Sequence, residues 1–230
     1  MKKIIFLVVF FNPLLLSAQS KISLSFGFLF EKEKFTIKEN TYHHFKNGDS
    51  ILIETLRFYI SNIEFLQDEK VVWKEANSVH LIDATLAKTL KITTDFSEKI
   101  KFNQLKFDLG IDSTTNVSGA LGGDLDPTKG MYWTWQSGYI NFKIEGKTPK
   151  SNARNQAFQY HLGGYLSPYY ALQKVILPIK KKGDILVRFD VADFLAKSDF
   201  SKKSHLMSPS AEAVLLSERV AKGFLGWNDF

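Results

Sequence analysis

Hydrophobic and polar residues alternate in the segment that begins shortly after residue 20. The segment reads Ile22-Ser23-Leu24-Ser25-Phe26-Gly27-Phe28-Leu29-Phe30, so large apolar side chains recur at every second position. Side chains of a β-strand point to opposite faces with a period of two residues. The pattern therefore predicts a half-buried strand over residues 22–30.

Further apolar or alternating segments, separated by turn residues, predict more strands. They cover residues 51–66, 71–73, 79–82, 102–111, 131–144, 158–162, 174–179 and 184–191. Asn62 inside the longest segment suggests a bulge, and residues 67–70 suggest a tight hairpin turn. The last two segments predict a hairpin around residues 180–183. Residues 112–130 carry several glycines and one proline, which predicts a long loop.

One helix is expected, at the end of the chain. Ser208 suits the N-cap, Pro209 suits the first helical position, and Glu212 favours the first turn. Ala213, Leu216, Val220 and Phe224 then fall on one face. Many strands without βαβ alternation predict an all-β fold, an antiparallel β-sandwich or barrel-like domain with a C-terminal helix.

The first residues have the layout of a secretory signal peptide. Lys2 and Lys3 precede an apolar run, and the small residues Ser17 and Ala18 follow it. The run is too short to cross a bilayer comfortably, since that takes about 20 apolar residues. We expect cleavage after Ala18, export to the periplasm or beyond, and no membrane insertion afterwards. Residues 19–230 then form a single domain.

Composition narrows the function classes. The chain has no cysteine, so disulfides and thiolate metal sites are excluded, and 20 Phe, 8 Tyr and 4 Trp must supply the core. The formal charge of +6 is spread along the sequence, and residues 180–182 read as a basic turn, so nucleic-acid binding is not expected. No phosphate-binding loop, nucleophile elbow or zinc-protease motif occurs, which argues against an enzyme.

Without thiolates, a soft or borderline metal must be bound by imidazole, helped by carboxylate or thioether. His161 ends a predicted strand and faces away from Phe158, Tyr160 and Leu162. It is a candidate ligand, although a surface or bridging histidine explains it as well.

Three other histidines are candidate ligands with similarly open interpretations. His43 and His44 are adjacent and point to opposite sides of a strand, so only one can join a given site. His205 shares a face with Met207 on an extended segment and offers copper a nitrogen and a sulfur. Each also reads as a surface residue. His80, in a short apolar segment, is expected to be structural.

Two other segments have a binding and a structural interpretation each. Trp133 and Trp135 would share a face of one strand, where core packing is favoured over a redox or binding role. Asp112, Asp124 and Asp126 offer oxygen ligands for calcium, but turns closed by aspartate side chains explain them more simply.

The order of several motifs resembles the MbnP-like family of exported proteins, also called metallo-mystery-pair proteins. The motifs are Leu56-Arg57-Phe58-Tyr59-Ile60-Ser61-Asn62, Phe107-Asp108-Leu109-Gly110-Ile111-Asp112, Gly123-Asp124-Leu125-Asp126-Pro127, Gly130-Met131-Tyr132-Trp133-Thr134-Trp135-Gln136-Ser137-Gly138-Tyr139 and Tyr160-His161-Leu162-Gly163. The chain looks like the cysteine-free branch of that family. The resemblance implies copper binding and a dihaem cytochrome c peroxidase-like partner that oxidises a tryptophan to kynurenine. By position that tryptophan is Trp133 or Trp135.

Two functional hypotheses therefore stand. The first is a periplasmic or extracellular copper-binding protein, which requires at least two histidines clustered at one end of the fold. The second is a non-metal β-sandwich binding module, in which the loop at residues 112–130 meets a protein or glycan partner and the histidines are scattered.

Overall fold

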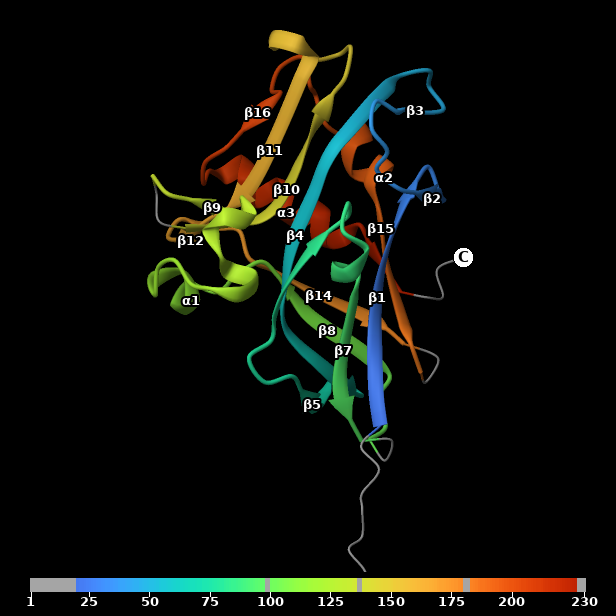
Figure 1. Ribbon diagram of the computed structural model, residues 1–230, viewed down its shortest axis with the longest axis vertical. Helices are drawn as coiled ribbons and strands as arrows, with labels where there is room; N and C mark the ends of the chain where they lie inside the picture. The colour runs from blue at the N-terminus through green and yellow to red at the C-terminus, as the bar shows by residue number, and fades with distance from the viewer. Residues whose placement is uncertain (1–19, 98–99, 136–137, 180–182, 227–230) are drawn as a thin grey trace, which may run out of the picture.

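The computed structural model describes residues 20–97, 100–135, 138–179 and 183–226. The predicted signal peptide and the basic run at 180–182 lie outside these residues. About half of the described chain is β-strand, arranged mainly in two curled sheets with helices packed against them (Figure 1). Within the described residues, no helix is long and apolar enough to cross a membrane.

The smaller of the two sheets is organised around β1 (Ser20–Phe30). Its order is β17 (Phe224–Leu225), β15 (Ile185–Asp190), β1 and β2 (Glu33–Phe35), and β7 (Lys91–Phe96) also pairs with β1. β1 and β15 run parallel, side by side on the right of Figure 1. The N-terminal strand and the C-terminal part of the chain thus complete one sheet together.

The larger sheet is built on β4 (Ser50–Gln67), which runs through much of the length of the molecule (Figure 1). Its order is β14 (Gln173–Pro178), β8 (Gln104–Leu109), β4, β10 (Gly138–Lys147), β11 (Ala157–Gly163) and β16 (His205–Leu206). The short strands β3 (Tyr42–His44), β5 (Lys70–Lys74) and β6 (Val79–Asp83) pair with β4, and β9 (Tyr132–Trp133) pairs with β10. A separate hairpin joins β12 (Tyr165–Leu166) to β13 (Tyr169–Tyr170).

Both sheets share one aromatic core. The ring of Phe58 on β4 contacts Phe26 and Phe28 of β1, Phe142 of β10 and Phe224 of β17. Helices α2 (Val191–Ala196) and α3 (Ala211–Lys222) add further buried side chains to it. A core of this kind buries enough apolar surface to stabilise a domain without disulfides.

Many predicted strands are confirmed. The alternating segment at 22–30 is β1, residues 51–66 form β4, and the turn after Gln67 leads into β5. Asn62 has a φ of 51°, and the pairing of β4 with β8 shifts register between Ser61 and Glu64, so the predicted bulge is present.

Four expectations about the elements are wrong. The fold is not purely antiparallel, because β1–β15 and β11–β16 pair in parallel. The segments at 174–179 and 184–191 form no hairpin, because β14 pairs with β8 while β15 pairs with β1 in the other sheet. Residues 131–144 contain two strands, β9 and β10, rather than one. The last helix begins after Ser210 and not after Ser208. The hydroxyl oxygen of Ser210 caps the helix by accepting a hydrogen bond from Ala213 N.

The loop at 112–130 contains short helical turns. They are α1 (Ser113–Val117), η2 (Gly123–Leu125) and η3 (Pro127–Lys129). α1 and α2 were not expected, since both are short and depend on an aspartate N-cap, Asp112 and Asp190.

Candidate metal centre

His161 lies on the face of β11 that points away from the main core. Phe158, Tyr160 and Leu162 alternate into the core, so Gln159 and His161 project from the opposite side. On the neighbouring strand β10, Glu145 is in register with Gln159 and therefore lies on the same side. His161 is nevertheless only 5% exposed.

Glu145 holds the imidazole of His161 in place. His161 Nε2 lies 2.7 Å from Glu145 Oε1, and Gln159 Nε2 donates to the same oxygen at 3.2 Å. Burial by itself would raise the pKa of Glu145, but the His161 hydrogen bond and the Lys143 ammonium outweigh it and hold that pKa at about 2. Glu145 is therefore ionised at neutral pH and accepts the Nε2 proton.

The second ring nitrogen of His161 is left without a partner. In the neutral imidazole, a proton on Nε2 leaves a lone pair on Nδ1. Nδ1 is buried, and no hydrogen-bond donor among the described residues reaches it. Buried polar atoms nearly always have a partner, so this lone pair marks a position suited to a ligand.

The two tryptophans occupy different environments beside this histidine. A Cβ added to Gly163, two residues from His161 on the same face, would lie 2.9 Å from the Trp133 ring, so the indole lies directly on β11. Trp133 is buried, whereas Trp135 is 65% exposed, and their ring centroids are 5.9 Å apart. The expectation that both share a face of one strand is wrong, because β9 ends at Trp133. Core packing describes Trp133 but not Trp135.

His205 is the candidate that the fold brings to the same face. β16 runs parallel to β11 with His205 opposite Gln159, and Leu206 opposite Tyr160 turns into the core. His205 is exposed, and its Nδ1 lies 3.0 Å from Ser204 Oγ. Met207, one residue beyond the strand, is also exposed.

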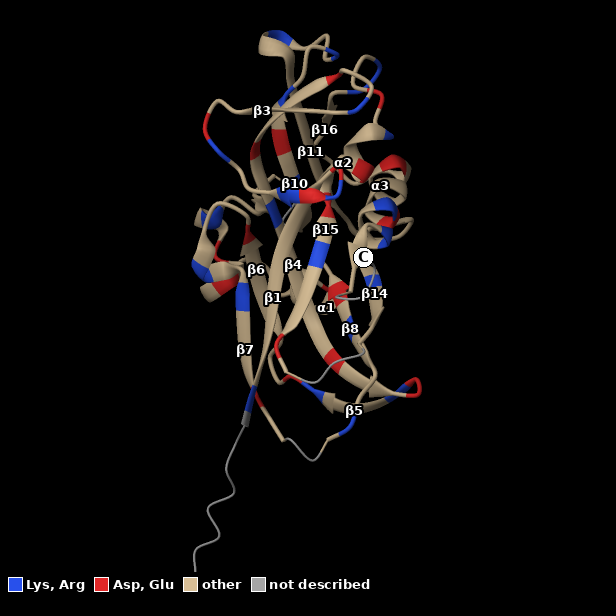
Figure 2. Ribbon diagram, turned by 90° about the vertical axis from the view of Figure 1, so that its right-hand side faces the viewer, with Lys and Arg blue, Asp and Glu red and all other residues tan. Residues whose placement is uncertain are grey.

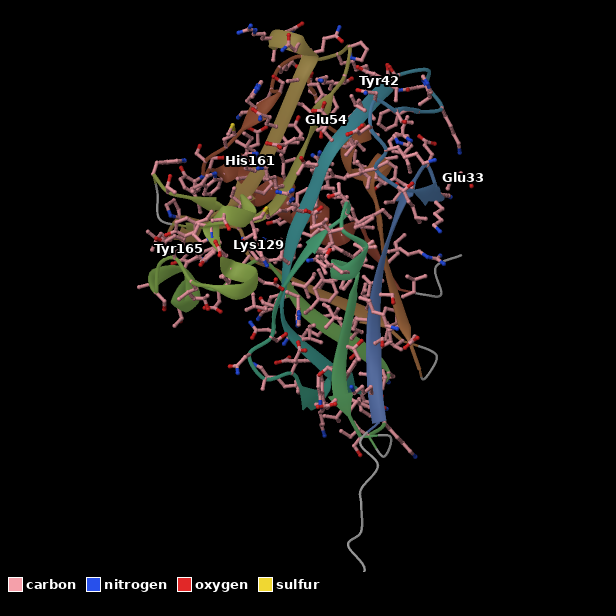
Figure 3. The ribbon with its side chains drawn as sticks, viewed as in Figure 1. Glu33, Tyr42, Glu54, Lys129, His161 and Tyr165 are labelled. Carbon is pink, nitrogen blue, oxygen red and sulfur yellow. The ribbon has the colours of Figure 1, made fainter. Side chains whose placement is uncertain are left out.

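His43 and His44 lie elsewhere. They belong to β3, which pairs with the start of β4, and Figure 3 places Tyr42 of this strand at the upper end of β4, apart from His161. The ring of His43 packs 4.7 Å from that of Phe35, and burial, together with His44 and Lys38, lowers the pKa of His43. His44 is exposed on the other side, as their adjacency predicts. The structure does not bring this pair to His161.

Other candidate residues have structural partners. His80 pairs with Glu75 at 2.8 Å. Asp112 caps α1 and Asp126 caps η3, while Asp124 binds Lys129 and the amide of Leu81. The aspartate-closed turns predicted for this loop are therefore present, and its carboxylates are already engaged. Within the described residues, no three His, Cys, Asp or Glu side chains gather closely enough to hold a metal.

The family model described as MbnP matches residues 19–209. The chain belongs to the MbnP family. Its fold also resembles the solved structure of MbnP from Methylosinus trichosporium, with a TM-score of 0.62 and 14% sequence identity over 84% of this chain and 82% of that one. At this identity the structural likeness concerns the fold alone. No curated protein matches the sequence.

Sequence reasoning missed two groups of residues that shape the site of this MbnP-family protein. Glu145 lies in a strand where polar and apolar residues alternate, so nothing local distinguishes it. Its pairing with His161 depends on the register of β10 and β11. The buried amides of Asn116 and Asn141 fix the loop that precedes β9: Asn116 accepts from Tyr139 N, and Asn141 accepts from Ile111 N. An asparagine within an apolar segment was the only available signal for Asn141.

Proposed function

We propose that this MbnP-family protein is exported and binds copper through His161. The observation that carries the proposal is the buried Nδ1 lone pair of His161, which has no donor among the described residues. Neutral imidazole is a suitable copper ligand when thiolates are absent. A carboxylate on the other ring nitrogen is the usual arrangement behind a metal-bound histidine, since it fixes the tautomer and the ring orientation.

His205 and Met207 are the further donors that fit this proposal. Both lie at the β16 end of the sheet beside β11, are exposed and offer a nitrogen and a thioether sulfur. Sulfur and imidazole together favour copper over harder cations such as calcium and magnesium. His43 and His44, on β3, are not part of the proposed site.

The direct test is copper titration of the purified mature chain, with bound metal counted by elemental analysis. We expect one tightly held copper per chain, which His161→Ala abolishes without changing the circular dichroism spectrum. His44→Ala is the matched control, because it removes an exposed histidine away from the site, and it should bind copper as before. Unchanged affinity in His161→Ala would remove His161 from the site, and a wild-type chain that binds no copper would favour the non-metal binding module.

The exposed indole of Trp135 is the better candidate for modification by a partner enzyme. A dihaem cytochrome c peroxidase-like partner has to approach from solvent, and Trp135 is largely exposed while Trp133 is buried. Mass spectrometry of the peptide that carries both residues, after co-expression with such a partner, should show a mass change. Trp135→Phe should abolish it, and a modification that persists in this variant would point to Trp133 instead.

A further inference from the structure

A polar cleft, which His161 does not line, lies between the edges of the two sheets. It is lined by β6 of the larger sheet, by β7 of the smaller sheet, and by the end of the loop at 112–130. The short helix η1 (Ala87–Thr89) closes it on one side. Its volume of about 560 Å³ is within the usual range for small-molecule sites.

Positive charge exceeds negative charge in this cleft. The charged lining residues are Arg57, Lys88, Lys91, Lys129, Asp83 and Asp124. Figure 2 shows lysine and arginine positions at the upper end of β7 and in the loops beside β6. The two carboxylates are fully engaged within the fold. Asp83 accepts from Arg57 Nε at 2.6 Å and from Thr85, and Asp124 accepts from Lys129 Nζ at 2.6 Å and from Leu81 N.

The guanidinium of Arg57 is held with one of its two NH2 groups unused. Nε binds Asp83, and Nη1 donates to the Lys129 carbonyl at 3.1 Å. Nη2 has no partner among the described residues, and its two N–H groups are available in a position that the other two bonds fix. Planar guanidinium groups held in a fixed position suit oxyanions such as carboxylate and phosphate.

Two lysines on the same cleft are also available. Lys88 on η1 has neither a hydrogen bond nor an ion pair with any residue that the structure describes, and Lys91 at the start of β7 only reaches Asp184 at 4.0 Å. The hydroxyl groups of Thr89, Thr93 and Thr128 add polar lining. Such a concave surface with excess positive charge raises the local concentration of anions.

We propose that this cleft binds a small organic anion, whose carboxylate or phosphate groups are held by Lys88, Lys91 and the free Nη2 group of Arg57. The site is distinct from the copper site and does not depend on it. The volume accommodates more than a bare phosphate ion, so the ligand carries an organic body as well as the anionic group.

Calorimetric titration of the purified chain with citrate and with inorganic phosphate tests this proposal, with chloride used to keep the ionic strength constant. We expect saturable binding of at least one probe, and the stronger probe identifies the preferred group. Exchanging both lysines in Lys88→Gln/Lys91→Gln should weaken binding at least about tenfold, since two charge-assisted contacts are lost. Arg57→Lys keeps a cation beside Asp83 but loses the planar edge, and it should also bind more weakly.

Two control variants distinguish binding in this cleft from a general effect of net charge and from binding at the proposed copper site. Lys197→Gln/Lys202→Gln removes two lysines that pair locally with Asp193 and Asp199, so it changes net charge equally and should leave the affinity unchanged. His161→Ala should also leave it unchanged. Equal weakening by both lysine pairs, or no effect of either, would mean an adventitious ion only and would overturn the proposal, as would the absence of saturable binding.

Discussion

The hydrogen bond between Glu145 and His161 positions the imidazole that is the proposed copper ligand. The half-buried carboxylate of Glu145, with a pKa of about 2, stays ionised in all but strong acid, and it keeps the proton of His161 on Nε2. We expect Glu145→Ala to weaken copper binding about 10–100-fold, the range found when an outer carboxylate is lost. Copper competition with a chelator measures this. Glu54→Ala, which removes an exposed glutamate paired with Lys147, should have no effect, and equal losses in both variants would contradict a positioning role.

Glu64 makes stability depend on pH. It lies on β4 between Lys74 of β5 and Lys106 of β8, at 3.5 and 2.7 Å. Burial raises the pKa of Glu64, but the two lysines outweigh it and the net shift is downward. A lowered pKa in the folded state means that the stabilisation is present above the ordinary glutamate pKa and is lost as pH falls below it.

Glu64→Gln should therefore lower the free energy of unfolding at pH 7 by about 1.5–3 kcal/mol and by much less near pH 3. Urea unfolding at the two pH values measures the difference. Glu39→Gln is the control, since the side chain of Glu39 is exposed and has no ion pair with a described residue. An equal loss at both pH values would show that Glu64 acts through packing rather than charge.

At the level of elements, local patterns predicted strands where the period of two is strong, as in β1, or where apolar residues dominate the segment, as in β4 and β11. The local patterns failed where contacts between residues distant in sequence determine where a strand ends. β9 and β10 look like one aromatic segment in the sequence, yet the chain turns back after Trp133, so that β9 pairs with β10 and the Trp133 ring lies against Gly163 of β11. The faces of Trp133 and Trp135, and hence their exposure, could not be read from the sequence for the same reason.

At Gly110, which follows β8, both the backbone conformation and the packing require a glycine. Its φ is +115°, and an added Cβ would lie 2.3 Å from Cγ of the buried Asn141. Gly110→Ala should lower the free energy of unfolding by about 2–4 kcal/mol, because it adds backbone strain and displaces the Asn141 bond to Ile111 N. Gly119→Ala is a matched control with φ +81° and nothing within 4 Å of the added Cβ. Urea midpoints should separate the two variants, and similar losses would show that backbone strain alone matters.

For the molecule as a whole, the composition and the strand count predicted a β-rich domain, but the order of the strands was beyond local reasoning. The parallel pairing of β1 with β15 joins residues about 160 positions apart, and nothing in either segment specifies its neighbour. The same limit applies to the candidate site. The pattern singled out His161 and His205, but only the register of β16 on β11 brings them to one face, and only the position of β3 separates His43 and His44 from them.

The C-terminal segment shows the same dependence on distant contacts. The family match ends at residue 209, yet α3 and β17 follow it and contribute to the core. Ala213, Leu216 and Val220 are buried along α3, and the ring of Phe224 contacts Phe58, Phe107 and Phe189 from both sheets. A chain that ends at Ser210 loses all of these contacts, so we expect it not to fold cooperatively.

A chain that ends at Gly226 retains every described contact and is the matched control for this truncation. Phe224→Ala in the full chain is a milder test, for which we expect a loss of about 3–5 kcal/mol because a large buried ring is removed. Thermal unfolding followed by circular dichroism distinguishes the three. A cooperative transition near that of the full chain in the Ser210 truncation would show that residues 19–209 are a self-sufficient domain and that α3 only covers it. Without such a transition, α3 and β17 are part of the domain that holds His161 and the anion cleft in place.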